Sequence, residues 1–255
     1  MAKFAVCVSY DGGYFAGWQV QPEQVTVQGV CEQVCERVVD HPVTWYGAGR
    51  TDAGVHASGM VAHFETHSTR TSEQVYRAMN SLLPRSVRVV WVKAVSDDFH
   101  ARHSALSRSY TYVIDMSAQH RPFARSWSHW LIKPIDVSAI QGVLPYFIGE
   151  QDFTNFRAQG CQSPHARREI HAFNLAQRNG FLYLNVTANA FVYRMVRKMV
   201  GTLIEVGQGK WSIADIIKAL DAEQSVLTPT APAHGLHFMH AEYEPSLSAP
   251  ISFTG

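Results

Sequence analysis

The chain of 255 residues is long enough for one large hydrophobic core or two modest ones, and we predict two. Its hydrophobic fraction of 46% is typical of a globular protein. No apolar run approaches the roughly 20 residues of a membrane span, and residues 1–6 lack a signal-peptide pattern. We therefore predict a cytoplasmic protein. The formal net charge of +1 argues against a protein that coats nucleic acid indiscriminately.

Strand and helix patterns alternate in the first part of the chain. Apolar residues at every second position predict a first strand that ends at a glycine turn, and two threonines precede helix-like stretches as N-caps. The predicted elements are strands over 4–10, 59–65 and 87–95, a helix after Thr26, and a helix after the capping pair Thr71 and Gln74. This order predicts an α+β unit with room for a short extra strand.

A similar order follows in the second part of the chain. The predicted elements are strands over 108–116, 170–176, 181–188 and 236–243, and helices over 137–147, 191–206 and from the capping pair Ser212 and Asp215 to residue 220. Pro145 is expected to kink its helix, and Asn179-Gly180 to form a hairpin turn. The two α+β halves meet near residue 105, and a cleft between such halves is a natural ligand site.

The segment G-A-G-R-T-D-A-G-V-H-A, residues 47–57, is the most informative part of the sequence. Its glycines and alanines leave room for a ligand, and it lacks both the P-loop pattern and the third glycine of the dinucleotide-binding pattern. Within it, Asp52 can serve as nucleophile, base or ion-pair partner, and Arg50 can hold a phosphate. A tight turn with a surface ion pair fits the same composition.

Basic and aromatic residues gather in two places. Seven basic residues stand against Glu169 alone between positions 153 and 200, and residues 99–112 mix aromatic rings, histidines and arginines. Aromatic faces stack on unpaired bases and arginines hold phosphates, so both stretches suit a nucleic-acid ligand. A solvated charged face and an ordinary domain junction are the alternatives, and either Tyr110 or Tyr112 could be a core residue.

Other kinds of site find little support. His100 with His103, and His165 with His171, lack the further ligands of a zinc site, and no G-x-S-x-G nucleophile pattern occurs. Arg197 lies on the apolar stripe of the helix over 191–206, where a cation needs a carboxylate partner unless it reaches solvent at the helix edge.

Longer motifs spread over nearly the whole chain resemble those of the bacterial tRNA pseudouridine synthase A family. They are Y-D-G at Tyr10, G-W-Q-x-Q from Gly17, the Asp52 segment, F-H-A-R at Phe99, R-x-Y-x-Y at Arg108, D-F-T-x-F-R at Asp152, A-F-x-x-x-M-V-R-x-x-V-G-T-L from Ala190 and T-A-P-A-x-G-L from Thr230. The resemblance implies isomerisation of uridines at positions 38, 39 and 40 of the tRNA anticodon stem-loop to pseudouridine.

The resemblance also implies a fold and partners. The fold is α+β, with two related ferredoxin-like (RRM-like) halves that share one extended, mainly antiparallel sheet and leave a cleft between them. The halves would be residues 1–104, with the catalytic aspartate loop, and residues 105–255, with the active-site tyrosine and a basic helix. The family implies a homodimer, tRNA as partner, and neither cofactor nor metal.

Site residues follow from matching positions. Asp52 matches the catalytic aspartate, Tyr110 the active-site tyrosine, Arg197 the basic partner of the aspartate and Leu236 an apolar residue against the target base. The residues that the resemblance assigns to RNA binding are Arg50, Phe99, His100, Ala101, Arg102, His103, Cys161, Gln162, Ser163, Arg168 and Arg194. Whether Asp52 attacks the sugar carbon, deprotonates the ribose or adds to the base stays open.

Some positions depart from the family pattern, Pro145 and the Tyr193-Arg194 pair among them. His103 stands where phenylalanine is common and Met60 where glutamine is frequent, and we expect both to affect the fit to RNA. Two other functions remain to be weighed: a non-catalytic RNA-binding protein of the same fold, and a glycosidase or nucleoside hydrolase, which usually needs two carboxylates.

Overall fold

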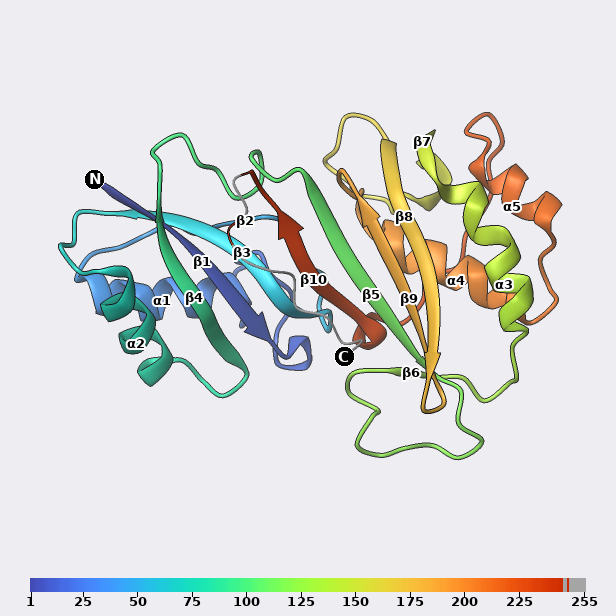
Figure 1. The fold of residues 1–255 in the computed structure, drawn as a ribbon, viewed down its shortest axis with the longest axis horizontal. Helices are drawn as coiled ribbons and strands as arrows, with labels where there is room; N and C mark the ends of the chain where they lie inside the picture. Colours follow the sequence, from blue (N-terminus) through green and yellow to red (C-terminus); the bar gives the residue numbers. More distant parts are fainter. Residues whose placement is uncertain (245–246, 248–255) are drawn as a thin grey trace. The chain divides into compact units, whose positions relative to one another are not determined.

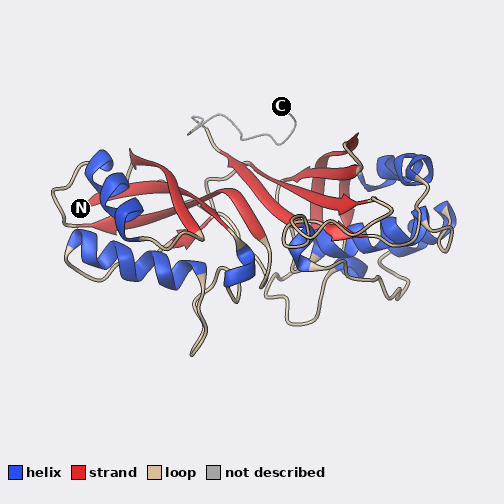
Figure 2. Ribbon diagram, turned by 90° about the horizontal axis from the view of Figure 1, so that it is seen from below, coloured by secondary structure: helices blue, strands red, loops and turns tan. Residues whose placement is uncertain are grey.

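The computed structural model describes residues 1–244 and 247. The described residues form two compact units: the first comprises residues 1–108 and the described residues from His237 onward, and the second comprises Ser109–Leu236. The predicted halves, 1–104 and 105–255, place the last strand differently, because that strand pairs with a strand of the first unit. Each unit consists of strands with helices packed against them (Figure 2).

The first unit has the strand order β4-β1-β3-β10, with β2 paired to β3 (Figure 1). Its strands are β1 (Ala2–Tyr10), β2 (Tyr46–Gly47), β3 (His56–Thr66), β4 (Val87–Val95) and β10 (Leu236–Glu242). Its helices are the short η1 (Gly12–Tyr14), α1 (Val27–Val39) and α2 (Ser72–Leu82). Strand β1 runs antiparallel to β3 and β4, whereas β10 runs parallel to β3 with His237 opposite His56.

Local side-chain caps begin both α-helices of the first unit, as predicted. The Thr26 hydroxyl accepts a hydrogen bond from the Gly29 amide at 3.3 Å, and Thr71 and Gln74 form a reciprocal capping box. The apolar stripe of α1 faces the core, where Cys31 and Cys35 are buried. Burial raises the pKa of Cys35 to about 12, so its thiol stays protonated and packs as a small core side chain.

The second unit has the strand order β5-β9-β8-β7, with β6 parallel to β5. Its strands are β5 (Ser107–Asp115), β6 (His129–Trp130), β7 (Gly149–Asp152), β8 (Arg167–Arg178) and β9 (Phe181–Ala188). Its helices are α3 (Val137–Val143), η2 (Leu144–Phe147), η3 (Thr154–Phe156), α4 (Met195–Gly207), α5 (Ile213–Leu220) and η4 (Ala233–Gly235). The α+β class with mainly antiparallel strands is confirmed.

Two helices differ from their predicted bounds for backbone reasons. Helix α4 begins at Met195 rather than near residue 191, because Arg194 has a left-handed backbone with φ of 60° that no α-helix continues through. Helix α3 ends at Val143 and passes into the 3-10 turn η2, since Pro145 has no amide hydrogen for an α-helical bond. The predicted helix over 137–147 is therefore an α-helix followed by a 3-10 turn that contains Pro145.

The hairpin between β8 and β9 turns where predicted. Asn179 and Gly180 both have positive φ, 52° and 80°, which is the backbone of a type I′ turn. Among the residues that the structure describes, no helix combines the length and the apolar character needed to cross a membrane.

Candidate active site

The Asp52 loop, residues 47–57, runs from β2 into β3 in the first unit. Asp52 is half-buried and Arg50 is exposed. The Asp52 carbonyl accepts a hydrogen bond from the Val55 amide at 3.1 Å, and Gly54 supplies the positive φ of 80° in this turn. The loop thus presents a carboxylate and, two residues before it, a cation, among small side chains.

A second segment, residues 10–18, holds the Asp52 loop from one side. The hydroxyls of Tyr10 and Thr51 lie 2.8 Å apart, and the Trp18 amide donates to the Thr51 carbonyl at 3.0 Å. A Cβ at Gly12 would lie 2.0 Å from the Val55 carbonyl oxygen, and one at Gly17 would lie 2.6 Å from that of Thr51. Only glycine permits such close backbone contact, which explains the Y-D-G and G-W motifs physically.

A buried indole supports the start of the same loop. Trp18 is 2% exposed, and a Cβ at Gly47 would lie within 2.7 Å of its ring. The Ala48 amide donates to the Val61 carbonyl at 2.8 Å. The Asp52 loop is therefore fixed by backbone contacts and close packing against the 10–18 segment and against β3, a preorganisation that a catalytic carboxylate requires.

The F-H-A-R-H residues belong to the 99–105 segment of the first unit, which is anchored through its backbone. Ala101 is fully buried; its amide donates to His63 Nδ1 at 3.1 Å, and its carbonyl accepts from Tyr243 Oη at 2.7 Å. Lys3 Nζ donates to the Phe99 carbonyl at 3.2 Å. The two residues after the anchor, Arg102 and His103, are exposed. The hydrogen bonds of Ala101 thus fix the backbone beside Arg102 and His103.

Aromatic rings line up beside this segment. Tyr46 stacks on His63 with centroids 5.1 Å apart, His63 lies 4.6 Å from His100, and His100 lies 4.3 Å from His103. Burial, with the charge of His100 next in size, lowers the pKa of His63 to about 4, so its Nδ1 remains an acceptor at neutral pH. Burial lowers the pKa of His100 too. Arg102 adds a permanently charged guanidinium to this row of rings.

In the second unit, β5 carries both tyrosines of the R-x-Y-x-Y motif. Tyr110 is buried, with its ring edge-to-face against Phe191 at a centroid distance of 5.1 Å. Tyr112 is fully buried, its Oη donates to the Pro232 carbonyl at 2.9 Å, and burial raises its pKa. Tyr112 is therefore a core residue, and the role of Tyr110, which is also buried, stays a prediction.

The 229–236 segment, which leads to Leu236, is tied to α4 and β5. Arg197 Nε donates to the Ala231 carbonyl at 2.8 Å, and the Ala231 amide donates back to the Arg197 carbonyl at 3.0 Å. Gly201 admits the Pro229 carbonyl and Gly235 admits the Tyr112 ring, since an added Cβ would lie 2.4 Å and 2.7 Å away, respectively. The structure thus links Arg197 to the segment that ends at Leu236.

The more deeply buried cation of α4 is one that the sequence did not single out. Lys198 is buried, whereas Arg197 is half-buried. Lys198 Nζ donates to the Thr228 carbonyl at 3.1 Å and to the Thr228 hydroxyl at 2.9 Å, and burial lowers its pKa. The sequence did not predict the burial of Lys198, because its hydrogen-bond partner Thr228 lies in a loop that is distant along the chain.

The remaining predicted RNA-binding residues fall in two groups. Arg168 donates from Nη2 to the Ser163 hydroxyl at 2.6 Å and from Nη1 to the His165 carbonyl at 3.3 Å, so it orders the segment that also holds Cys161 and Gln162. Arg194 is exposed at the start of α4, 4.9 Å from the centre of the Tyr193 ring. These placements leave their role in RNA binding a prediction.

Met60 requires a correction. The sequence predicted an effect of this residue on the fit to RNA, but its side chain is fully buried on β3. It is one of the largest fully buried side chains of the described part of the chain. Met60 therefore fills the core of the first unit, and His103, which is exposed, is the departure that faces solvent.

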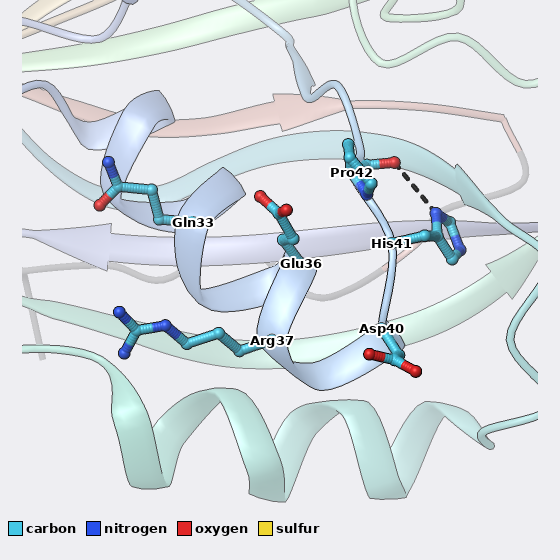
Figure 3. A pocket seen from close by; sticks show the side chains of 6 residues that line it. All are labelled: Gln33, Glu36, Arg37, Asp40, His41 and Pro42. Carbon is cyan, nitrogen blue, oxygen red and sulfur yellow. Dashed lines mark hydrogen bonds between the residues drawn. The ribbon is translucent and has the colours of Figure 1, made fainter.

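A surface depression in the first unit lies away from the predicted site residues. It is formed around the end of α1 by Gln33, Glu36, Arg37, Asp40, His41 and Pro42 (Figure 3). His41 Nδ1 lies 3.0 Å from the Pro42 carbonyl oxygen at its edge. None of the predicted site residues lines it. Within the described residues, no group of three or more His, Cys, Asp or Glu side chains could hold a metal ion.

Comparison with known proteins adds the decisive observation. A family model described as tRNA pseudouridine synthase matches residues 6–104 and 144–244, which is most of the chain. The chain belongs to the tRNA pseudouridine synthase family. The resemblance noted in the sequence is therefore confirmed, and so is the enzyme class: members of the family are isomerases that act on tRNA.

Curated tRNA pseudouridine synthases match nearly the full length of this chain. The tRNA pseudouridine synthase A of Hydrogenovibrio crunogenus is 38% identical over 98% of this chain and 96% of its own. That of Aeromonas salmonicida is 40% identical over 97% of this chain and 93% of its own. That of Coxiella burnetii (strain Dugway 5J108-111) is 39% identical over 98% and 96%.

The chemistry of a tRNA pseudouridine synthase suits the residues found. Uridine becomes pseudouridine when the bond from N1 to the sugar carbon breaks and C5 of the same base bonds to that carbon in its place. Every atom is retained, so a carboxylate to start the reaction and a group to take the C5 proton suffice. The Asp52 loop offers the first group, and Tyr110 is a candidate for the second.

Proposed function

We propose that this tRNA pseudouridine synthase isomerises uridines at positions 38, 39 and 40 of the anticodon stem-loop, and that Asp52 begins cleavage of the glycosidic bond of a flipped uridine. The observation that carries the proposal is the Asp52 loop: a half-buried carboxylate on a backbone held by the 10–18 segment and by β3, with small neighbours and an exposed arginine two residues away. Such a loop leaves space for an extruded nucleotide.

The other proposed roles follow from chemistry at matching motif positions. Arg197 serves as the basic partner of the catalytic aspartate, the role that its matching motif position implies. Tyr110 stacks on the flipped uracil and helps to remove the C5 proton. Leu236 packs against the base.

RNA binding in this proposal begins with exposed arginines of the first unit. Arg50 and Arg102 hold backbone phosphates and keep the target nucleotide extruded. The 99–103 residues, the 161–168 segment and Arg194 extend the contact. The active protein is a cytoplasmic homodimer, and its mass in solution should be twice the 28.5 kDa of one chain.

Pseudouridine mapping on unmodified transcripts tests the proposed function. The substrates are tRNA transcripts with uridine at position 38, 39 or 40, with matched transcripts that carry cytidine there and free uridine as controls. We expect pseudouridine at those positions only, and none from free uridine. Product elsewhere in the tRNA would contradict the proposed target, and absence of product with every transcript would contradict the proposed function.

A further inference from the structure

Arg108 opens the R-x-Y-x-Y motif, yet the proposed function gives it no task. It is the second residue of β5 and the last residue of the first unit. Its side chain is 8% exposed, which is unusual for an arginine. Burying a guanidinium is costly unless its donors are satisfied, so its contacts should show what it is for.

The Arg108 guanidinium donates to backbone carbonyls of two different segments. Nε donates to the Ala48 carbonyl of the Asp52 loop at 3.3 Å. Nη1 donates to the Ala105 carbonyl at 2.9 Å, and Nη2 donates to the Arg102 carbonyl. One rigid, planar group therefore ties the catalytic loop to the 99–105 segment.

Two of these three carbonyls, those of Ala48 and Arg102, belong to segments with proposed functions. Ala48 precedes Asp52 by four residues, and its amide is already held by Val61. Arg102 is exposed, so the residue whose backbone Arg108 holds presents its own side chain to solvent, where the proposed function places a phosphate. A displacement of either segment changes the distance from the phosphate-binding group to the carboxylate.

Other contacts of the 99–105 segment differ in kind. His63 and Tyr243 hold Ala101, and the Ser104 hydroxyl accepts a hydrogen bond from the His100 amide at 3.0 Å. These contacts fix the segment itself. The contacts of Arg108 reach the Asp52 loop as well, and they need the fork of an arginine, since lysine is a point charge on a flexible stem.

We propose that Arg108 is a positioning residue that sets the distance between the Arg102 phosphate-binding group and the Asp52 carboxylate. RNA held at Arg102 is thereby presented to Asp52 in one geometry. The inference rests on the proposed function, to which it adds a specific residue. Misplacement of a reacting group by about 1 Å costs roughly a hundredfold in rate, which sets the scale of the expected effect.

A double-mutant cycle tests the role of Arg108. Arg108→Lys, Arg102→Ala and the double variant are compared with the parent for kcat and KM on a tRNA transcript that the parent modifies. We expect Arg108→Lys to lower kcat/KM by roughly ten- to a hundredfold. The increase in KM caused by Arg102→Ala should be much smaller in the Arg108→Lys background, because the two residues act as one unit.

Controls separate positioning from general stability. Arg108→Gln goes through the same cycle, so the result does not depend on the folding of one variant. Arg88→Lys is a further control, because the exposed Arg88 also donates, through Nη1, to carbonyls of the first unit, those of Leu83, Pro84 and Val87. We expect Arg88→Lys to lower the melting temperature and to leave kcat/KM unchanged.

The possible outcomes distinguish the two proposals. Additive effects of the Arg102 and Arg108 substitutions, or parental kcat/KM in Arg108→Lys, would overturn the positioning role while the proposed function stands. Absence of pseudouridine with the parent protein would overturn the proposed function itself. Coupling between the two residues in KM, with Arg88→Lys inert, supports the positioning role.

Discussion

Each unit has an arginine that donates a hydrogen bond to a backbone carbonyl of a segment with a predicted site residue. Arg108 donates from its three guanidinium nitrogens to carbonyls of Ala48, Ala105 and Arg102 and is almost fully buried. Arg197 donates Nε to the Ala231 carbonyl at 2.8 Å and is only half-buried. The same chemical group thus occurs in two environments.

The difference in burial indicates what each arginine can do. A guanidinium enclosed by backbone carbonyls acts on the protein itself, so Arg108 belongs to the frame of the Asp52 loop. A guanidinium that holds a carbonyl through Nε and stays partly exposed can also face a carboxylate or a phosphate. The comparison therefore separates a positioning residue from a candidate catalytic one, although in the sequence each is simply the arginine of a motif.

The largest expected effect comes from a substitution that disturbs the close packing against the Asp52 loop in the first unit. Gly17→Ala places a side chain at a φ of 102° and 2.6 Å from the Thr51 carbonyl oxygen, so we expect a loss of about 2 kcal/mol or more in the free energy of unfolding and loss of turnover. Denaturant unfolding and a pseudouridine assay measure both. Gly13→Ala is the control, since its Cβ would meet only the Asp11 carboxylate at 3.2 Å. Parental stability and turnover in Gly17→Ala would contradict the account of the loop.

The second prediction contrasts the two tyrosines of β5. Tyr110→Phe should bind tRNA as the parent does but lose turnover by roughly a hundredfold or more, because the hydroxyl takes part in proton transfer. Tyr112→Phe removes the hydrogen bond to Pro232 and should instead lower the free energy of unfolding by about 1 kcal/mol. Filter binding, turnover and denaturant unfolding distinguish the two. If Tyr110→Phe turned over tRNA normally, Tyr110 would have no part in proton removal.

The smallest expected effect is a pH dependence of stability. His63 has its pKa lowered to about 4, whereas in the unfolded chain it titrates near 6.5. The unfolded state therefore binds the proton first, so the stability is full above about pH 6.5 and declines as the pH falls toward 4. His63→Asn does not titrate and keeps an oxygen that can accept the Ala101 amide.

Melting temperatures at about pH 7.5 and about pH 5 test this dependence. The decrease between the two conditions should be smaller in His63→Asn than in the parent. His129, whose pKa burial also lowers to about 4, is the matching histidine of the second unit, and His129→Asn should reduce the decrease as well. An unchanged decrease in His63→Asn would show that His63 is not held neutral in the folded chain.

The sequence predicted those features that depend on neighbours along the chain. Strand β4 has its predicted bounds, and the capping pairs at Thr71 and Ser212 form as expected, because a cap uses atoms within three residues. The start of α4 was missed because nothing in the local pattern marks Arg194 as left-handed. The burial of Met60 was missed because it depends on packing from distant elements.

In the candidate site, too, features that depend on the local sequence were predicted and features that depend on distant contacts were not. Asp52, Tyr110 and Arg197 were found from motifs, since a motif records residue types at fixed spacing. Their supports could not be derived that way. The Trp18 contact and the Arg108 contact join the Asp52 loop to residues 33 and 60 positions away, respectively, and only the fold shows that they meet.

Single-turnover measurement of pseudouridine formation by the parent and by Asp52→Asn tests the central claim most directly. Asparagine keeps the size of the side chain and removes its charge and basicity, so tRNA binding and melting temperature should remain close to those of the parent. The account predicts product at position 38, 39 or 40 with the parent and none with Asp52→Asn. Equal product from both proteins would contradict it.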